Sequence, residues 1–210
     1  MPRPQNTEER RAQISDGLIR VMAKRGYDGA SVAEIARAAQ LTPGLVHYHF
    51  KSKQEILLAA LTELVTRHQT RLDDHLERAE AAAPARVAAF IDLHLGLGAT
   101  ADPDALACWI LLSGEALRQP AVKHQYKRAV SLLVQRLEGI IQEGLLNRHF
   151  VDVDAKAAAA AIFAAIQGYF ALAAVSRDLV PRGTAGRSLL QMAEGLLGTD
   201  LPAPHARGAA

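Results

Sequence analysis

Cysteine, aromatic side chains and an excess of one charge are all scarce in this chain of 210 residues. The single cysteine, Cys108, excludes an internal disulfide and a metal site built from several cysteines. Aromatic residues make up only 5% of the chain, and Ala, Leu and Ile dominate its apolar half, which favours helices over sheets. The formal net charge is only +2, so a basic surface would require an uneven distribution of charge.

Long apolar runs are also rare. Only residues 157–175 are apolar enough to suggest a membrane span, but alanine dominates this run and Gln167 lies inside it. Alanine is barely favourable in a bilayer, whereas a helix buried between other helices is often apolar on all sides. The first residues are polar and lack the apolar core of a signal peptide. We therefore expect a soluble, cytoplasmic protein.

The charges are distributed unevenly along the chain. Residues 1–53 contain nine Lys and Arg against five acidic residues, whereas residues 54–210 contain 15 basic and 17 acidic residues. A basic N-terminal segment joined to a slightly acidic remainder is typical of a nucleic-acid-binding module attached to a second function. The asymmetry is modest and is weak evidence by itself.

Helical periodicity extends along the whole chain, and no stretch alternates convincingly like a strand. Ser31 with Glu34 forms a capping box, and Thr42 precedes a proline at the first position of the next helix. Ser52 with Glu55 forms a second capping box that starts a long helix. The sequence therefore predicts an all-α fold of nine helices, three in a short N-terminal head and six in a body.

The remaining helix boundaries follow from glycine, proline and polar breaks. The first helix starts at Asn6 or Thr7 and stops at Gly26. The body helices are predicted at about 53–80, 85–99, 104–119, 120–144, 154–177 and 184–197. This division predicts a DNA-binding domain at 1–53, a ligand-binding and dimerisation domain at 54–198, and a flexible tail at 199–210.

The most informative segment is 31–57, which reads SVAEIARAAQLTPGLVHYHFKSKQEIL. Two short helices joined by a tight turn have the dimensions of a helix-turn-helix, in which the second helix enters the major groove of DNA. Ile35, Leu41, Val46 and Phe50 are predicted to face inward. On periodicity and charge alone, an ordinary helical hairpin whose short polar helix simply faces water fits equally well.

The residues S-V-A-E-I-A, then L-T-P-G-x-V, then H-Y-H-F-x-S-K-x-E-I-L closely resemble the N-terminal head of TetR-family regulators. The resemblance covers about residues 10–60, and His47 stands where the family usually has tyrosine. It implies a homodimer that reads a palindromic operator, and a small-molecule effector that releases it. The body does not match at the level of motifs, but nine helices with a long penultimate one agree with the family architecture.

Eight residues of the head are predicted to contact DNA. Lys53, at a helix N-terminus, is expected to bind a phosphate, as are Tyr48 and Thr42 through their hydroxyls. His47 is the best candidate for touching a base edge, and Leu45 offers apolar contact to a thymine methyl group. The predicted set is Ser31, Thr42, Pro43, Gly44, Leu45, His47, Tyr48 and Lys53.

Residues 42–49 lack the Arg, Lys, Asn and Gln side chains that read guanine or adenine in bidentate fashion. Specificity should therefore depend on phosphate placement, dimer spacing and DNA shape. Arg3, Arg10 and Arg11 could add charge contacts from the N-terminal arm. We expect a salt-sensitive complex that tolerates single base changes.

The body is predicted to hold the dimer interface and the effector pocket. The resemblance implies that the last two long helices pair with those of a second copy as a four-helix bundle. Small residues around 157–168 and an apolar stripe over 189–197 suit that role. An apolar cavity with a few polar groups would form the pocket. Its candidate residues are Phe90, His94, Cys108, Trp109, Leu112, Glu115, Phe163, Gln167 and Phe170.

Several points stay open from the residues alone. Each pocket aromatic is as readily a core residue, and Cys108 is more readily a structural thiol than a redox sensor. Residues 107–120 resemble the choline-sensing branch of the family, which would let Trp109 bind a cation with Glu115 as counter-charge. No metal, cofactor or catalytic motif is found, which disfavours an enzyme. The residues are also compatible with a helical adaptor that binds proteins and with a DNA-binding activator.

Overall fold

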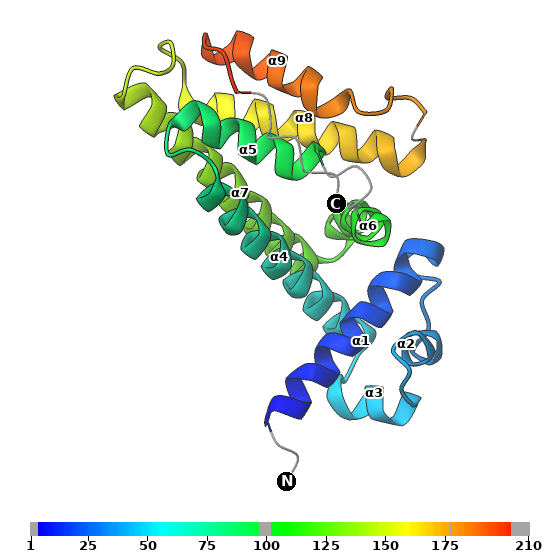
Figure 1. The fold of residues 1–210 in the computed structure, drawn as a ribbon. Coiled ribbons are helices and arrows are strands. Elements are labelled where there is room, and N and C mark those ends of the chain that lie inside the picture. Colours follow the sequence, from blue (N-terminus) through cyan, green and yellow to red (C-terminus); the bar gives the residue numbers. More distant parts are fainter. Residues whose placement is uncertain (1–3, 97–101, 177, 203–210) are drawn as a thin grey trace, which may run out of the picture. The chain divides into compact units, whose positions relative to one another are not determined.

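The computed structural model describes residues 4–96, 102–176 and 178–202, and all the regular structure within these ranges is helical. The predicted all-α class is confirmed, and nine helices are present in the described residues (Figure 1). The helices are α1 Pro4–Arg25, α2 Val32–Ala38, α3 Pro43–His49, α4 Lys53–Arg78, α5 Ala83–Leu95, α6 Pro103–Arg118, α7 Pro120–Leu146, α8 Ala155–Val175 and α9 Ala185–Leu197. Most ends lie within a few residues of the predicted positions.

The chain forms two compact units, each with its own core. The first comprises the residues up to His68 together with Asp102–Ala129, and the second comprises the remainder. Helices α4 and α7 each contribute residues to both units. The functional division predicted after residue 53 is a different boundary, and it stays a prediction.

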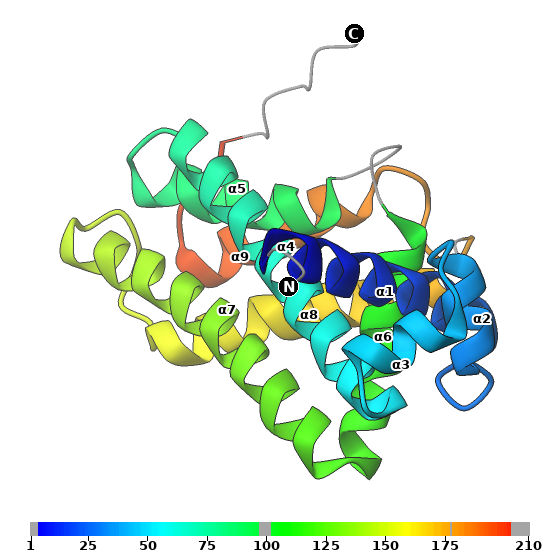
Figure 2. The same ribbon diagram turned by 90° about the horizontal axis from the view of Figure 1, so that it is seen from below.

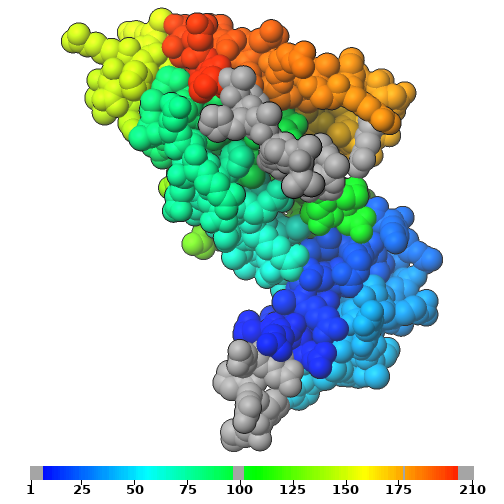
Figure 3. Space-filling view, viewed as in Figure 1, coloured from blue at the N-terminus to red at the C-terminus, as the bar shows by residue number. Residues whose placement is uncertain are grey.

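The first unit contains the predicted helix-turn-helix. Figures 1 and 2 both show α1, α2 and α3 gathered into one three-helix cluster, and Figure 3 shows their side chains packed into a continuous surface. The capping box at α2 is confirmed, because Glu34 donates its N–H to Ser31 Oγ at 3.2 Å and accepts from the Ser31 N–H at 3.1 Å. At α3, the Leu45 N–H donates to Thr42 Oγ1 at 3.3 Å. These bonds satisfy N–H groups that the first turn of a helix leaves without a partner.

The turn between α2 and α3 is closed by backbone bonds. The Leu41 N–H donates to the Ala36 carbonyl at 2.8 Å, and the Gln40 N–H donates to the Arg37 carbonyl at 3.1 Å. This is the Schellman arrangement, which requires a left-handed residue just after the helix. Gln40 adopts that conformation with φ of 55°, a region that glycine occupies at lower cost. The turn therefore fixes the angle between the two helices of the motif.

Helix α6 packs against α1 and completes the core of the first unit. Cys108 and Leu112 of α6 are fully buried there with Met22 of α1, and the Cys108 Sγ lies 3.8 Å from the Met22 Sδ. Burial, followed by the charges of Asp102 and Asp104, raises the pKa of the Cys108 thiol to about 12. A thiol in this environment is neutral and unreactive, as expected of a structural residue.

The second unit is built around α5, α8 and α9, which lie side by side in Figure 1. Phe90, Leu137, Ile166 and Leu197 are among the fully buried residues of its core. Leu201, in the predicted tail, is also buried in this core, and its N–H donates to Glu194 Oε1 at 3.1 Å. Ordered packing therefore continues past α9, while residues 203–210 of the predicted tail lie outside the described residues.

Helix α8 is long and apolar enough to cross a membrane by length and composition alone. Such a helix is weak evidence for a membrane protein, because core helices of soluble proteins pass the same test. However, only 28% of its apolar window is buried within the single chain. Much of this apolar helix is therefore left uncovered by its own chain.

Candidate DNA-binding surface

Helix α3 presents an outer face that the described residues of the first unit leave uncovered. Of the predicted DNA contacts, Thr42, Pro43, Gly44, His47 and Tyr48 are exposed, and Leu45 is half-buried. The Tyr48 side chain is 67% exposed, which is unusual for a large aromatic residue. The face combines hydroxyl, imidazole and small groups on one short helix, which suits close approach to a groove.

The inner face of α3 fixes the orientation of the outer one. Val46 and Phe50 are buried in the core, as the periodicity predicts. Arg11 of α1 donates to the His49 carbonyl at 2.6 Å, and its guanidinium carbon lies 4.0 Å from the centre of the Phe50 ring. The predicted role of Arg11 as a DNA contact is therefore matched by a structural one, because a cation favours the carbonyl end of a helix. Arg3 lies outside the described residues.

His49 is held in place by its neighbours. Its ring stands edge-on to Tyr48, with ring centres 5.0 Å apart and planes at 87°. Burial, followed by the charges of Arg11 and Arg10, lowers the pKa of His49. The side chain therefore stays neutral at physiological pH and supports the exposed face through packing.

Lys53 occupies the first position of α4, close to the start of α2. Its ammonium donates to the Tyr27 carbonyl at 2.9 Å and lies 4.3 Å from the centre of the Tyr27 ring. The capping box predicted here forms in part. The Glu55 N–H donates to Ser52 Oγ at 3.2 Å, but Glu55 Oε2 accepts from the Lys51 N–H at 2.8 Å instead of the Ser52 N–H.

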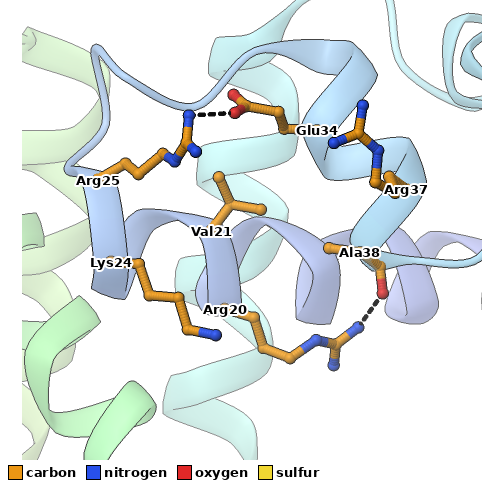
Figure 4. Close-up of a pocket in the computed structure, with 7 residues that line it drawn as sticks. All are labelled: Arg20, Val21, Lys24, Arg25, Glu34, Arg37 and Ala38. Carbon is orange, nitrogen blue, oxygen red and sulfur yellow. Dashed lines mark hydrogen bonds and ion pairs between the residues drawn. The ribbon is translucent and has the colours of Figure 1, made fainter.

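A basic groove of about 340 Å³ runs between α1 and α2 (Figure 4). Arg20, Lys24, Arg25 and Arg37 line it with a single acidic side chain, Glu34. Arg25 pairs with Glu34 at 2.5 Å, and Arg20 donates to the Ala38 carbonyl at 2.5 Å. The groove keeps a positive balance, which concentrates the basic charge predicted for the head and attracts polyanions at long range.

The predicted effector residues divide between the two cores. Phe90, His94, Phe163 and Phe170 meet in the second unit, where the buried imidazole of His94 lies 4.5, 6.2 and 6.3 Å from the three ring centres. The Phe90 carbonyl lies 2.7 Å from His94 Nδ1, which fixes the imidazole in the aromatic cluster. Gln167 lies on the same helix as Phe163 and Phe170, and it is half-buried. The helical spacing of these residues therefore predicted a real cluster.

The α6 residues of the predicted pocket belong to the first unit. Trp109 stacks on Tyr126 with ring centres 4.7 Å apart, whereas Cys108 and Leu112 are buried in the core. Glu115 accepts a hydrogen bond from Gln119 at 2.7 Å and acts on Tyr27 through its charge. Six positions separate Trp109 from Glu115, which turns them to different sides of the helix. The structure does not bring the predicted cation site and its counter-charge together.

Sequence reasoning missed Tyr27, Gln119 and Tyr126. None of them belongs to a motif, and each gains its role from a residue distant in the chain. An aromatic residue directly after the glycine that ends α1 was the only local signal. Tyr126 is buried beside Trp109, and that burial raises its pKa to about 12.

Comparison with known proteins agrees with this surface. Residues 14–60 match the family model described as "Bacterial regulatory proteins, tetR family". The HTH-type transcriptional regulator BetI of Rhizobium meliloti is 30% identical over 147 residues, covering 69% of this chain and 68% of that protein. BetI of Brucella canis is 28% identical over 191 residues, covering 82% of this chain and 95% of that protein.

A solved structure is also similar over most of the chain. It is a transcriptional regulator from Saccharomonospora viridis in complex with choline, with a TM-score of 0.77 and 26% identity. The match covers 91% of this chain and 96% of that one.

The three-helix head and its exposed α3 define a helix-turn-helix DNA-binding protein. The chain belongs to the TetR family, and it is a DNA-binding transcriptional regulator and not an enzyme.

Proposed function

We propose that this protein is a homodimeric repressor that binds a palindromic operator and is released by a small-molecule effector. The observation that carries the DNA-binding part is the uncovered face of α3, held from behind by Val46, Phe50 and Arg11. We assign the eight predicted head residues to this contact. A dimer bound over a promoter would block transcription, and we place its action in the cytoplasm, where the DNA lies.

Dimerisation is supported by the apolar surface that α8 and α9 leave exposed. Val175 is 85% exposed and Met192 is 59% exposed, and Leu172 and Leu196 add to the same two helices. Gly168 and Gly195 have open space around their Cα atoms among the described residues, so neither is needed for packing within the chain. Small residues let helices approach closely, and exposed apolar residues favour burial by a partner. A second copy of this chain would cover these faces.

The dimer can be tested by placing a charge in this surface. We expect Met192→Glu to convert the dimer to monomer in analytical ultracentrifugation, because a carboxylate would be buried without a partner. Leu117→Glu is the matched control, since Leu117 is 86% exposed on α6 of the first unit. Dissociation by both variants, or by neither, would contradict the assignment of the interface.

For the effector, we propose a quaternary ammonium compound of the choline type. Two relatives are BetI regulators, and a similar structure binds choline. Aromatic ring faces attract such cations. The cluster of Phe90, His94, Phe163 and Phe170 offers several rings around one buried polar group, with half-buried Gln167 on the same helix as Phe163 and Phe170. The Trp109–Tyr126 pair is the second aromatic group we assign to ligand recognition.

The DNA-binding part is tested first. The duplex is selected from a random-sequence pool, and binding is measured by fluorescence anisotropy at two salt concentrations. We expect salt-dependent binding that Lys53→Ala and Tyr48→Phe weaken, because each variant removes a predicted phosphate contact. Failure to select any duplex at low salt would refute the proposal and favour a protein-binding adaptor.

The effector is tested by adding choline to the protein–DNA complex. Choline should release the DNA, whereas its neutral carbon isostere, with a tert-butyl group in place of the trimethylammonium, should not. Phe163→Leu should weaken release while leaving DNA affinity without choline intact. Equal action of choline and its isostere would contradict cation recognition, and no action of either would leave a different effector class as the conclusion.

A further inference from the structure

The side chain proposed to bind a DNA phosphate is already held by one other residue. The ammonium of Lys53 donates to the Tyr27 carbonyl at 2.9 Å and lies 4.3 Å from the centre of the same residue's ring. Lys53 and Tyr27 are both half-buried. An ammonium has three N–H donors, so it can keep these two contacts and still offer a donor to a phosphate.

Tyr27 is itself fixed from α6. Gln119, which ends α6, is hydrogen-bonded through its side chain to Tyr27. The same amide donates to Glu115 at 2.7 Å and accepts from Gln54 of α4 at 3.0 Å. The turn after α1, the start of α4 and the end of α6 therefore meet in one polar junction around the Tyr27 ring.

We propose that Tyr27 is a positioning residue for DNA binding, which holds the Lys53 ammonium in place to receive an operator phosphate. This inference rests on the proposed phosphate role of Lys53. A free lysine side chain has many rotamers, and ordering them on binding lowers affinity. Tyr27 restricts these rotamers before DNA arrives, using its carbonyl oxygen and its ring face.

A competing role for Tyr27 would have the opposite sign. If the Tyr27 contacts had to break before the ammonium could reach DNA, Tyr27 would compete with the phosphate and its removal would strengthen binding. The direction of the change in affinity therefore separates positioning from competition.

The experiment is a double-mutant cycle on the full-length protein, using the selected duplex and a series of salt concentrations. Lys53→Ala should reduce the slope of log affinity against log salt by about 0.9, as expected for the loss of one phosphate contact. Tyr27→Leu should weaken binding by about 2- to 12-fold in the presence of Lys53, which corresponds to ordering one flexible side chain. In the Lys53→Ala background, Tyr27→Leu should have almost no further effect.

Two control variants make the cycle specific. Tyr27→Phe keeps the ring and the carbonyl, so it should retain most of the affinity, and any loss would measure the link to Gln119. Lys51 lies two residues before Lys53 and is exposed, so Lys51→Ala should combine additively with Tyr27→Leu. Thermal unfolding of each variant shows that the folded fraction is unchanged at the temperature of the assay.

The outcomes of the cycle are distinct. An equal loss from Tyr27→Leu with and without Lys53 would overturn the positioning role, because the effect would then be general to the fold. Unchanged or tighter binding by Tyr27→Leu would overturn it as well. An unchanged salt slope for Lys53→Ala would remove the phosphate role of Lys53 itself, and with it the inference, without affecting the family assignment.

Discussion

The close approach of α1 and α2 makes Gly17 a sensitive point of the DNA-binding head. Gly17 is buried, and a Cβ added there would lie 2.8 Å from the Ile35 carbonyl oxygen and 3.1 Å from the Ala39 Cβ. The nearest of these atoms belongs to the backbone and cannot rotate away. We therefore expect Gly17→Ala to force α1 and α2 apart by several tenths of an ångström and to disturb the motif that carries α3.

Gly114 provides the matched control for estimating the size of this effect. It lies inside α6, is exposed, and has none of the described residues' atoms within 4 Å of an added Cβ. Alanine favours a helix interior over glycine by about 0.5–1 kcal/mol, so Gly114→Ala should stabilise the protein by that amount. The same gain applies at Gly17, but overpacking typically costs about 1–3 kcal/mol. The difference between the two variants should therefore equal the overpacking cost, because the propensity gain cancels.

The assay is thermal unfolding followed by circular dichroism, with DNA affinity measured on the same samples. For a chain of this size, about 2–4 °C in Tm corresponds to 1 kcal/mol, so Gly17→Ala should melt about 2–12 °C below Gly114→Ala. It should also bind the selected duplex more weakly, whereas Gly114→Ala should not. Equal melting temperatures for the two variants would refute the close contact between α1 and α2.

Three further predictions test other parts of the fold. Gln40→Gly should raise stability by up to about 1 kcal/mol in urea unfolding, because glycine relieves the left-handed backbone, and a loss of stability would contradict this account of the turn. Gly144→Ala should destabilise by about 1–3 kcal/mol, since its Cβ would lie 2.0 Å from the ring of buried Phe150, and an unchanged Tm would show that the ring moves freely. Cys108 should react with a thiol reagent at pH 8 orders of magnitude more slowly in the folded protein than in urea, because its pKa is raised to about 12, and rapid labelling would refute its burial. For the same reason, its contribution to stability is complete below pH 9 and is lost as the pH rises toward 12.

The sequence by itself determined the local features of this protein. Capping at Ser31 and Thr42, the proline at the start of α3, and the 3.6-residue periodicity each involve residues within about one helical turn. Such signals do not depend on the rest of the chain, so they predicted the nine helices and the helix-turn-helix. The face of α3 was predicted for the same reason, because its outward positions follow once Val46 and Phe50 face inward.

The tertiary structure decided which helices share a core. Cys108 lies 86 positions from Met22 in the sequence, yet the two sulfurs are in contact, and this pairing places α6 against α1 in the first unit. It also explains why the predicted effector residues divide between two cores. An apolar stripe shows that a helix buries one face, but many other helices offer a complementary stripe, and only packing of the whole chain selects among them.

The polar contacts of the head were also decided by the tertiary structure. The ammonium of Lys53 is bound by Tyr27, and the guanidinium of Arg11 holds the end of α3. Lysine and arginine side chains are long and flexible, so the sequence shows their charge but not their partner. Their partners depend on where backbone carbonyls and ring faces lie after folding. The chain's class and motif were thus local properties, whereas the arrangement that orients its DNA-binding groups depends on contacts between distant residues.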